Sequence, residues 1–470
     1  MLLTVTVLLM LIPSTCGKNP AVQVTLTDKG LQYGKHAGTD WFQDHLGNVT
    51  FPDISGGIKI KIFGTIDYAL TGIKIIKCDL PEPSVDFYPD ATGFKTSMSG
   101  LSIALNGEWR THYGIIHDGG TFDMAVFDVS VLSVVELGKD DDGHLSISSV
   151  SCEAKVGDVN IVFQGGGSWI FQPFVHHFTG RIGREIQSRI CPNVEQIIVT
   201  LEHHLQAMNV SFDVDQALSL DLSLTDLPVI DASKLNLGFK GEFYSIKSHT
   251  DPPFEAQPFT IPEQQGYMLA MGLSEYTLNS ASYGYYSSGG FQAFINDSMI
   301  PPGCPVHLNT SLMGPFIPQL PKMFPGLLMY LQVYAIKAPM LSFHSDAIKL
   351  GVQANVKAFA IQPNGTETPL FKLGVDSQFN SKVWIDGQKV KGSVSMNNFT
   401  LTLVGSEVGE FETDPLERLA KLGVNLALTK VNVKMGKGFD LPRMKHSQLV
   451  NSVLKMQEGF IALFSDAEVL

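Results

Sequence analysis

The longest amphipathic pattern in the chain follows three glycines, Gly165-Gly166-Gly167. Before them, Val159, Ile161 and Phe163 alternate with other residues, as in a β-strand with one buried face. After them, apolar residues recur at helical spacing: Phe174, Phe178, Ile182, Ile186, Ile190, Val194, Ile197, Leu201 and Leu205. This spacing predicts a long helix whose apolar stripe winds around it, which suits a curved, twisted sheet. We expect Pro192 to kink or end the helix.

Two cysteines belong to this segment. Cys152 lies in the strand region before the glycines, and Cys191 lies inside the predicted helix. We interpret them as a disulfide that joins the helix to the strand, with two separate buried thiols as the alternative. Closing a ring of this size stabilises a fold by roughly 4 kcal/mol through loop entropy. The sequence assigns no partner to Cys78 or Cys304.

A second helix is predicted near the start of the chain. Residues 22–26 alternate as a strand, and Thr27 or Asp28 can cap a helix that runs to about residue 46. Its apolar face consists of Leu31, Tyr33, Trp41, Phe42 and Leu46. Gly30, Gly34 and Gly38 share one face, and each costs roughly 1 kcal/mol of helix stability relative to alanine. Close approach of a sheet or an acyl chain would explain them; the alternative is a frayed, partly non-helical start.

Further alternating runs predict strands. One apolar face, Phe122, Met124 and Val126, changes phase to Phe127, Val129 and Val131, which predicts a β-bulge and therefore a curled sheet. Other alternating runs cover residues 58–62, 218–222 and 235–239. Four prolines in residues 251–262 predict a stiff, extended connector, and we expect the domain junction close to it.

The second half repeats this plan. Gly272-Leu273-Ser274-Glu275-Tyr276 echoes Gly30-Leu31-Gln32-Tyr33, and we expect a helix to follow it. Strands are predicted at residues 306–312, 329–335 and 348–360, and residues 384–388 predict a hairpin with a two-residue turn. Asp414 and Pro415 predict a helix cap and first turn, before a helix that carries Leu416, Leu419, Leu426 and Ala427.

Composition narrows the class of protein. The 470 residues suggest two large domains, and 44% apolar against 17% charged residues allows a large core or a lipid-holding interior. The net charge of −13 argues against nucleic acid as a partner and against a strongly cationic membrane-lytic mechanism. No apolar run after the first residues is long enough for a membrane span.

The ends and modification signals predict a secreted, soluble protein. Residues 1–17 contain an apolar run followed by small residues, which is typical of a secretory signal peptide. Six Asn-x-Ser/Thr sequons are compatible with N-linked glycosylation: Asn48, Asn209, Asn296, Asn309, Asn364 and Asn398. We expect an extracellular protein.

Enzymatic activity is not predicted. The chain has no Gly-x-Ser-x-Gly elbow, no His-Glu-x-x-His motif and no phosphate-cradling glycine loop. His176-His177 and Glu202-His203-His204 are adjacent residues on a predicted helix, where they point in different directions, so helical surface is favoured over a metal site. Ser168 has no partnered histidine and aspartate evident from spacing. We therefore assign no catalytic residue and no metal.

The chain resembles the family of bactericidal/permeability-increasing protein and lipopolysaccharide-binding protein. The resemblance runs from Asn19 nearly to the C-terminus and rests on the order of several short motifs. These are Lys29-Gly30-Leu31-Gln32-Tyr33, Ile58-Lys59-Ile60-Lys61, Gly241-Glu242-Phe243-Tyr244-Ser245, Pro252-Pro253-Phe254, Leu273-Ser274-Glu275-Tyr276, residues 297–301, residues 356–363 and Leu463-Phe464. Cys152 and Cys191 fall where that family places its single structural disulfide.

The resemblance implies an α+β fold: an elongated boomerang of two similar curled β-barrels, each with two flanking helices, joined by a central sheet. It implies an N-terminal barrel domain in residues 18–225 and a C-terminal one in residues 264–470, each with a lipid pocket. Residues 226–263 would supply central-sheet strands and the proline-rich linker.

The resemblance also implies bound phospholipid, with no other cofactor. The lipid-pocket candidates are Leu31, Tyr33, Trp41, Phe42, Phe174, Phe178, Ile182, Leu273, Tyr276, Leu419 and Leu426. Ordinary core packing is the alternative for each of them.

Antibacterial members of this family resemble one another in a basic tip that contacts the phosphates of lipid A. Lys59, Lys61 and Arg110 are the candidates for a lipopolysaccharide-binding rim here. Thr65 and Glu108 stand where cationic members tend to carry lysine, and only His112 and His117 are nearby in the segment that follows. Solvated surface is the alternative for the lysines.

The resemblance therefore implies a monomeric, secreted lipid-binding protein of innate defence. Its partners would be the lipid A of Gram-negative lipopolysaccharide, phospholipid and the bacterial outer-membrane surface. The main alternative is an extracellular phospholipid-transfer protein, which would not need a basic tip. A secreted scaffold with filled cores and a protein partner is a third class.

Overall fold

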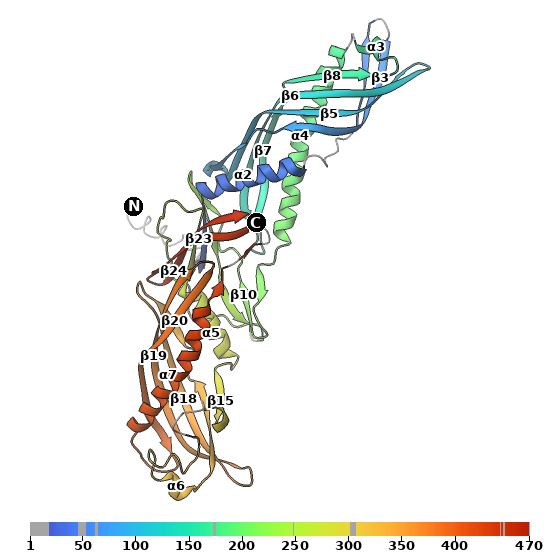
Figure 1. Ribbon diagram of the computed structural model, residues 1–470. Helices are drawn as coiled ribbons and strands as arrows, with labels where there is room; N and C mark the ends of the chain where they lie inside the picture. The colour runs from blue at the N-terminus through green and yellow to red at the C-terminus, as the bar shows by residue number, and fades with distance from the viewer. Residues whose placement is uncertain are drawn as a thin grey trace, which may run out of the picture.

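A computed structural model describes residues 18–45, 53–61, 64–172, 175–247, 249–300, 307–441, 443–444 and 447–469. Two curled sheets lie at opposite ends of an elongated molecule, and a third sheet lies between them (Figure 1). The mixed α+β boomerang predicted from the sequence is therefore confirmed. No helix of the described residues is both long enough and apolar enough to cross a membrane.

The central sheet is built from segments far apart in the chain. Its strands, in spatial order, are β11 (Val229–Ile230), β12 (Lys234–Phe239), β1 (Val22–Thr27), β14 (Leu269–Ser274), β24 (Phe460–Val469), β23 (Ser447–Gln457) and β22 (Arg443–Met444). The two strands β1 and β14 pair antiparallel at its middle, with Val22 opposite Leu273 and Leu26 opposite Leu269. The sheet thus takes strands from well outside residues 226–263.

The first barrel is one long sheet with strands in the order β2, β3, β5, β6 and β7. Their bounds are β2 Ile54–Ile60, β3 Gly64–Asp79, β5 Gly93–Tyr113, β6 Ile116–Lys139 and β7 Leu145–Lys155; β4 (Ser84–Tyr88), the 3-10 turn η2 (Pro89–Ala91) and β8 (Asp158–Gln164) complete it. The predicted bulge in β6 is confirmed, because Val126 and Val129 face Ile103 and Leu101 with one extra residue between them. Contrary to prediction, Phe127 is exposed, since the following residue takes the positive φ.

The helix α2 (Asp28–His45) follows β1 without a break. Thr27 caps it, because its Oγ1 accepts a hydrogen bond of 3.4 Å from the backbone N–H of Gly30. A Cβ at Gly30 would lie 2.6 Å from the carbonyl oxygen of Met268, so glycine is required by close approach of the backbone that precedes β14. The predicted alternative, a frayed start, is wrong.

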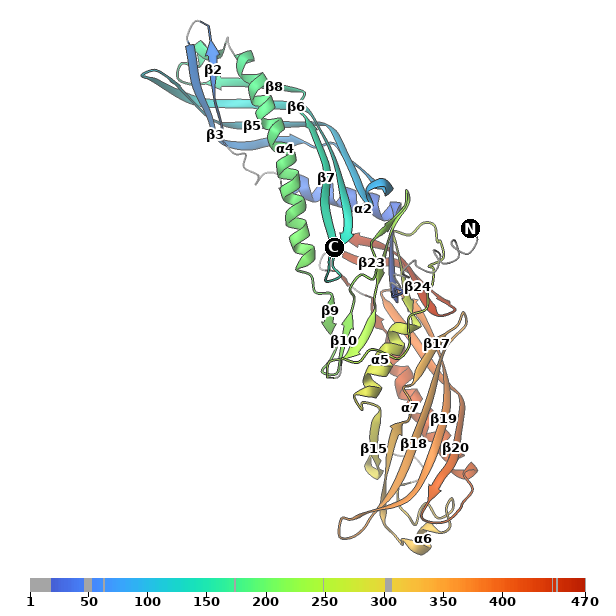
Figure 2. The ribbon, with the colours of Figure 1, turned by 180° about the vertical axis from the view of Figure 1, so that it is seen from behind.

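The helices α3 (Ser168–Phe171) and α4 (Val175–Gln206) follow β8, and α4 lies along the first barrel (Figure 2). Pro192 does not end α4, which continues for more than three turns beyond it. Ile182 and Ile186 pack in the barrel core as predicted. Beyond Cys191 the predicted stripe is partly wrong: Val194 and Leu205 are half-buried, but Ile197 and Leu201 are exposed and Ile198 is buried instead.

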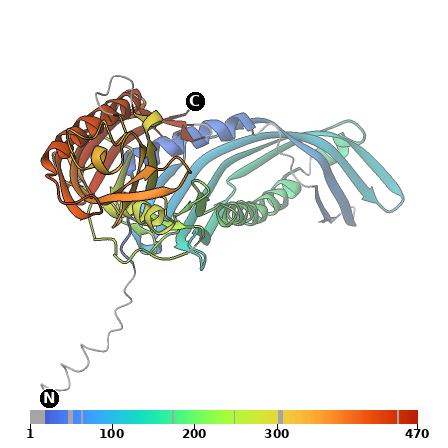
Figure 3. The ribbon, with the colours of Figure 1, turned by 90° about the horizontal axis from the view of Figure 1, so that it is seen from below.

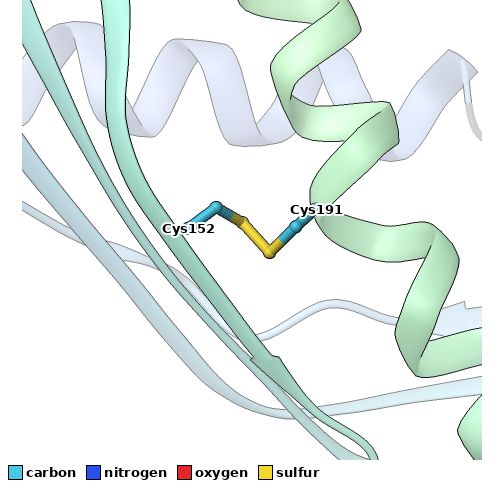
Figure 4. Close-up of a disulfide and its surroundings, with 2 residues drawn as sticks. All are labelled: Cys152 and Cys191. Carbon is cyan, nitrogen blue, oxygen red and sulfur yellow. A yellow bond between two sulfur atoms is a disulfide. The ribbon is translucent and has the colours of Figure 1, made fainter.

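The predicted disulfide between Cys152 and Cys191 is confirmed. It links β7 to the middle of α4, with the two Cα atoms 5.6 Å apart (Figure 4). The helix is therefore attached covalently to the sheet that it covers, close to the position where Pro192 removes a backbone hydrogen bond.

The second barrel repeats the architecture of the first. Its sheet contains β15 (Gln292–Asn296), β16 (Leu328–Ala335), β18 (Ile348–Ile361), β19 (Glu367–Asp386), β20 (Lys389–Ser406) and β21 (Phe439–Asp440), with β17 (Met340–Phe343) beside β18. The helices are α5 (Glu275–Ser287), α6 (Leu320–Met323) and α7 (Asp414–Lys437), with a 3-10 turn η4 (Asp297–Met299). A small sheet of β13 (Glu242–Ser245), β10 (Leu218–Asp221) and β9 (Ser211–Asp213) lies near the junction. Figure 3 shows this barrel from below, with α2 and α4 of the first barrel extending away from it.

Several details of the second half differ from prediction. Residues 307–312 form turns with a single bridge at Asn309, so the predicted strand is wrong. The cap residue of α7 is Thr413, which makes Asp414 the first helical residue. Gly272 lies in a strand whereas Gly30 lies in a helix, so the two motifs that echo each other in sequence are not equivalent in space. The hairpin at residues 384–388 is confirmed, with Gly387 at φ +59° in its turn.

A buried polar network joins the small sheet to α5. Glu242 is buried, and its Oε1 lies 2.9 Å from Nζ of Lys240, which also lies 3.0 Å from Oδ2 of Asp221. The hydroxyl of Tyr276 donates a hydrogen bond to Oε2 of Glu242. Burial alone would lower the pKa of Lys240, but its bonds to Glu242 and Asp221 raise it. Burial and the bond to Glu242 both raise the pKa of Tyr276.

Removing the disulfide should destabilise the first barrel. We expect the double variant Cys152→Ser/Cys191→Ser to lose about 4 kcal/mol of unfolding free energy, because the unfolded chain gains loop entropy. Chemical denaturation of the two proteins measures this loss. The matched control is Cys78→Ser, which removes a half-buried free thiol and should change the unfolding free energy far less. Equal midpoints for the wild type and the double variant would contradict the prediction.

The network at Glu242 should stabilise the junction. We expect Glu242→Ala to cost about 3 kcal/mol, because it leaves Lys240 and Tyr276 without their shared buried partner. Thermal unfolding provides the measurement. Glu263→Gln is the control, since Glu263 forms an exposed ion pair with Lys234 at 3.1 Å and should contribute below about 1 kcal/mol. Similar losses of stability for both variants would show that the buried network at Glu242 contributes no more than an exposed ion pair.

Candidate functional site

The far end of the first barrel brings the predicted rim residues onto one face. We define the tip as residues 57–61, 64–67, 110–119 and 165–171, which include the ends of the β2–β3 and β5–β6 hairpins and α3. Lys59, opposite Thr65 on β3, and Arg110, next to the buried Trp109 on β5, are exposed, and Lys61 is exposed at the turn after β2. Three basic side chains are therefore exposed at this end of the barrel.

The cationic charge of the tip is partly compensated. Nη2 of Arg110 lies 3.5 Å from Oε2 of Glu108, and both side chains are mostly exposed, so the pair is weak. Asp67 is the register partner of both Gly57 and His112, which places a carboxylate on the same outer face. Among the described residues Lys59 and Lys61 form no ion pair. The two lysines are thus the strongest cations available to an anionic ligand.

Two histidines are paired on the same hairpin. His112 and His117 are opposite each other on β5 and β6, with their Nδ1 atoms 3.0 Å apart and ring centroids 4.3 Å apart. One imidazole must donate and the other must accept in this contact.

Exposed apolar side chains lie beside these cations. Ile115 is 96% exposed at the β5–β6 turn, Tyr113 is 42% exposed before it, and Trp169 is 75% exposed on α3. Sequence analysis did not identify them as functional. Trp169 follows the three glycines, which was the available signal, but its place at the tip depends on contacts between distant strands. An apolar and cationic surface at one end of the molecule suits an amphiphilic ligand.

Asp118 accepts hydrogen bonds that hold α3 in place at the tip. Oδ1 of Asp118 accepts from the backbone N–H of Gly119 at 2.9 Å, and its Oδ2 accepts from Gly167 at 2.6 Å. Behind this loop, Nε1 of Trp109 donates to the carbonyl of Gln164 at 3.1 Å, and Trp109 packs edge-on against Phe163. The glycine-rich segment is therefore held beside the β5–β6 hairpin.

The helix α4 supports the tip from the other face of the sheet. The guanidinium of Arg181 donates to the carbonyl of Gly57, and Nη2 of Arg189 donates to that of Asp53 at 3.5 Å. A Cβ at Gly56 would lie 3.1 Å from the Arg181 guanidinium, which explains the small residue there. Burial raises the pKa of Tyr68 beside them, against the effect of Arg181. The helix thus connects the disulfide to the strand that carries Lys59.

The lipid-pocket candidates of the first half are only partly visible. Leu31 packs at the base of the first barrel against a cluster that includes Phe87, Leu137 and Leu235. Tyr33 is half-buried, and Ile182 is buried in the barrel core. The side chains of Trp41, Phe42 and Phe178, and the whole of Phe174, lie outside the described residues. The structure therefore does not assemble these candidates into one lining.

The candidates of the second half lie in two separate places. Leu273 is on β14 in the central sheet, and Tyr276 at the start of α5 packs against Ala21, Ala256 and Phe254. Leu419 and Leu426 lie on α7, where Leu426 is 39% exposed. The face of α7 that meets the barrel core carries Leu416, Ala420 and Val424 instead. The spacing of apolar residues did not distinguish these two faces.

The glycosylation candidates lie mostly on the surface. Asn209, Asn296, Asn364 and Asn398 are exposed, and Asn48 lies outside the described residues. Asn309 is half-buried, and its side chain accepts a hydrogen bond of 2.9 Å from the backbone of Ser311.

One group within the described residues has the geometry for a metal ion. Ligand atoms of Asp140, Asp142 and His144, in the β6–β7 turn, lie within 4.8 Å of one another. Oδ2 of Asp140 already contacts Nδ1 of His144 at 2.8 Å. Burial alone would raise the pKa of Asp140, but hydrogen bonds from His144 and Asp142 lower it. These contacts account for the acidic turn without an ion.

Comparisons with known proteins agree with this architecture. The profile of the LBP / BPI / CETP family, N-terminal domain, matches residues 30–208, and that of the C-terminal domain matches residues 212–469. The chain is 35% identical over 463 residues to a bactericidal permeability-increasing protein from Sebastes schlegelii, covering 98% of each chain. It is 28% identical to the lipopolysaccharide-binding protein of Homo sapiens, over 97% of this chain and 95% of that one.

A solved structure shares the fold. The crystal structure of a lipopolysaccharide-binding protein matches with a TM-score of 0.59 at 26% identity, over 96% of this chain and 99% of that chain. The two profiles together, and each relative and this structure by itself, extend over nearly the whole chain. The chain therefore belongs to the LBP / BPI / CETP family.

Proposed function

We propose that this protein binds the lipid A part of Gram-negative lipopolysaccharide through the tip of its first barrel. The observation that carries the proposal is the exposure of Ile115 and Trp169 at the same tip as the exposed Lys59 and Lys61. Lipid A combines phosphate groups with acyl chains, so a surface that offers ammonium groups and apolar side chains together fits both parts. The names of the relatives, among them lipopolysaccharide-binding protein, support the same ligand class.

The binding would divide into two physical contributions. The lysines attract phosphate through space, and this attraction weakens as salt shortens the Debye length to about 8 Å at physiological ionic strength. The isoleucine and tryptophan side chains bury apolar area at roughly 25 cal/mol per Å². Because Glu108 and Asp67 reduce the cationic field, the apolar contribution would be larger here than in a strongly basic tip.

The protein would act outside the cell, as a binding protein without covalent chemistry. The disulfide between Cys152 and Cys191 and the exposed sequons support an extracellular site of action. The proposed role is innate defence, in which a monomer sequesters or neutralises endotoxin at the bacterial outer-membrane surface.

Phospholipid would occupy the interior of the two barrels, between the helices and the sheets. Apolar residues of the helices that pack toward the sheets support this part of the proposal, notably Ile186 and Ile190 on α4 and Ala420 and Val424 on α7. Acyl chains would lie against the same helix faces.

A second candidate function is extracellular phospholipid transfer. The specific observation in its favour is the pairing of Glu108 with Arg110, which weakens the cationic rim that lipid A recognition uses. The same interior pockets would then serve as a shuttle between lipid surfaces. Uptake of neutral phosphatidylcholine equal to or better than that of lipid A would favour transfer.

The tip should bind lipid A in a salt-sensitive way. We expect Lys59→Gln/Lys61→Gln to weaken binding to immobilised lipid A about ten-fold at low salt, and less at high salt because the lost interaction is screened. We expect Ile115→Asp to weaken binding at every salt concentration, because it removes apolar burial. Surface plasmon resonance across a salt series measures both effects.

The control for the apolar part is Leu227→Asp, which introduces the same change at an exposed leucine far from the tip. It should leave lipid A binding unchanged. If the affinity for lipid A changed neither with salt concentration nor in the tip variants, the tip would be excluded as the binding site.

Phospholipid should accompany the purified protein. We expect organic extraction of never-delipidated protein, followed by mass spectrometry, to yield close to two phospholipid molecules per chain. Each barrel would hold one phospholipid in its interior. Extraction from an unrelated secreted protein of similar size, purified in parallel, gives the background. An extract at background level would contradict interior lipid.

A further inference from the structure

Two lysines face each other on the outer surface of the second barrel. Lys357 on β18 and Lys372 on β19 are register partners, while their neighbours Ala358 and Phe371 are buried in the barrel core. The alternation of strand side chains therefore points both lysines outward. Like charges directly opposite each other on neighbouring strands destabilise a sheet. Their persistence at this position needs a reason.

Neither lysine forms an ion pair with a described residue, although two lysines at the far end of the same sheet, beside the β19–β20 turn, do. Lys389 lies 3.1 Å from Asp440, and Lys391 lies 2.5 Å from Asp386. Nζ of Lys357 instead lies 5.5 Å from the centre of the Tyr334 ring, a cation–π contact that leaves its donors available. The nearby carboxylate of Glu367 is engaged by the hydroxyl of Tyr330 at 2.5 Å.

Two surface hollows, each of about 330 Å³, share Lys357 as a lining residue. The first is lined also by Gln332 and Tyr334, and the second by Lys372, Ser406 and Glu407. Gly405 is opposite Lys372, and a Cβ there would meet no atom within 4 Å. Space is therefore open beside both ammonium groups.

Two bulges bracket Lys372. Leu370 is an extra residue in β19 relative to β18, and Val404 is an extra residue in β20 relative to β19. Bulges bend strands and redirect side chains, and they occur often beside functional sites. Here the bulges lie on either side of the register row formed by Lys357, Lys372 and Gly405.

An aromatic wall adjoins the lysines. Tyr330 and Phe359 stack with centroids 4.9 Å apart and planes 8° from parallel, and Phe359 lies two residues beyond Lys357 on β18. Flat apolar surface beside ammonium, amide and hydroxyl groups suits a ligand that has a ring with apolar faces, hydroxyl groups and an anionic substituent. Glu407, at the rim of the second hollow, would accept hydrogen bonds from hydroxyl groups.

We propose that Lys357 and Lys372 form a binding site for a phosphorylated saccharide on the outer face of the second barrel. The phosphate lies between the two ammonium groups, where it removes their mutual repulsion, and the sugar ring lies against the aromatic wall. This site is separate from the tip and does not depend on the function proposed for it. Inorganic phosphate shares the phosphate chemistry but lacks the ring.

Lysine acetylation of the intact protein, followed residue by residue with mass spectrometry, tests the site. The probes are millimolar glucose 1-phosphate, inorganic phosphate and glucose at low ionic strength. We expect glucose 1-phosphate to slow acetylation of Lys357 and Lys372 several-fold and inorganic phosphate to slow it less. Glucose alone should have no effect. Lys349, exposed on the same strand, is the internal control and should react at an unchanged rate.

The same spectra report Lys59 and Lys61, so failure at the tip and failure at this site are separate results. Unchanged rates at Lys357 and Lys372 with every probe would overturn the proposal. Equal protection by inorganic phosphate would overturn the saccharide assignment.

Two substitutions give a second, independent measurement. We expect Lys357→Gln and Lys372→Gln each to weaken glucose 1-phosphate binding in calorimetry about ten-fold, the effect of losing one charge-assisted hydrogen bond. Lys349→Gln should bind normally. Because repulsion is relieved, neither site variant should lower the thermal midpoint, which separates loss of the site from loss of the fold. Normal binding by both variants would contradict the assignment.

Discussion

The antiparallel pairing of β1 with β14 is the constraint on which the rest of this molecule depends. Each strand leads directly into a helix, β1 into α2 at Asp28 and β14 into α5 at Glu275. Because the strands run in opposite directions, the two helices leave the central sheet in opposite directions. The two barrels are therefore placed at opposite ends, and each keeps one end free. Two features stabilise this junction: the close contact of Gly30 with the backbone before β14, and the polar network around Glu242.

The first barrel extends from that junction to a tip that carries exposed side chains. Its long strands carry the β2–β3 and β5–β6 turns far from the central sheet, and α4 runs beside them from the junction to the tip. The helix is tied to β7 by the disulfide and to β2 by Arg181. Side chains at the tip thus sit on a supported framework, although they are themselves exposed. An exposed isoleucine and tryptophan are stable there because the core beneath them is complete without them.

The distribution of charge on this protein does not favour binding by positive charge alone. The chain has a net charge of −13, and the tip itself contains Glu108 and Asp67 beside its basic residues. The second barrel carries an uncompensated lysine pair on its outer face. Two separate regions of unpaired positive charge, at different places on an acidic molecule, are better suited to recognising defined anionic groups than to general attraction by a negative surface.

Local sequence patterns determined the elements of this protein. Alternation predicted many of the strands, although it failed at residues 307–312, helical spacing predicted α2 and α4, and the phase change after Val126 predicted the bulge in the first sheet. The cap at Thr27 and the hairpin turn at Gly387 also followed from residue type, because both depend on neighbours within a few positions. The fold and the disulfide were accessible from the sequence together with the order of its short motifs.

Tertiary structure alone decided which residues meet. Pro192 was expected to kink or end α4, but the helix continues past it because the disulfide and the sheet hold both sides. Ile198 rather than Ile197 is buried, since contact with β7 sets the rotation of the helix. Lys357 and Lys372 come together through strand register. Register is a long-range property: it depends on hydrogen bonds between distant segments, and no local spacing encodes it.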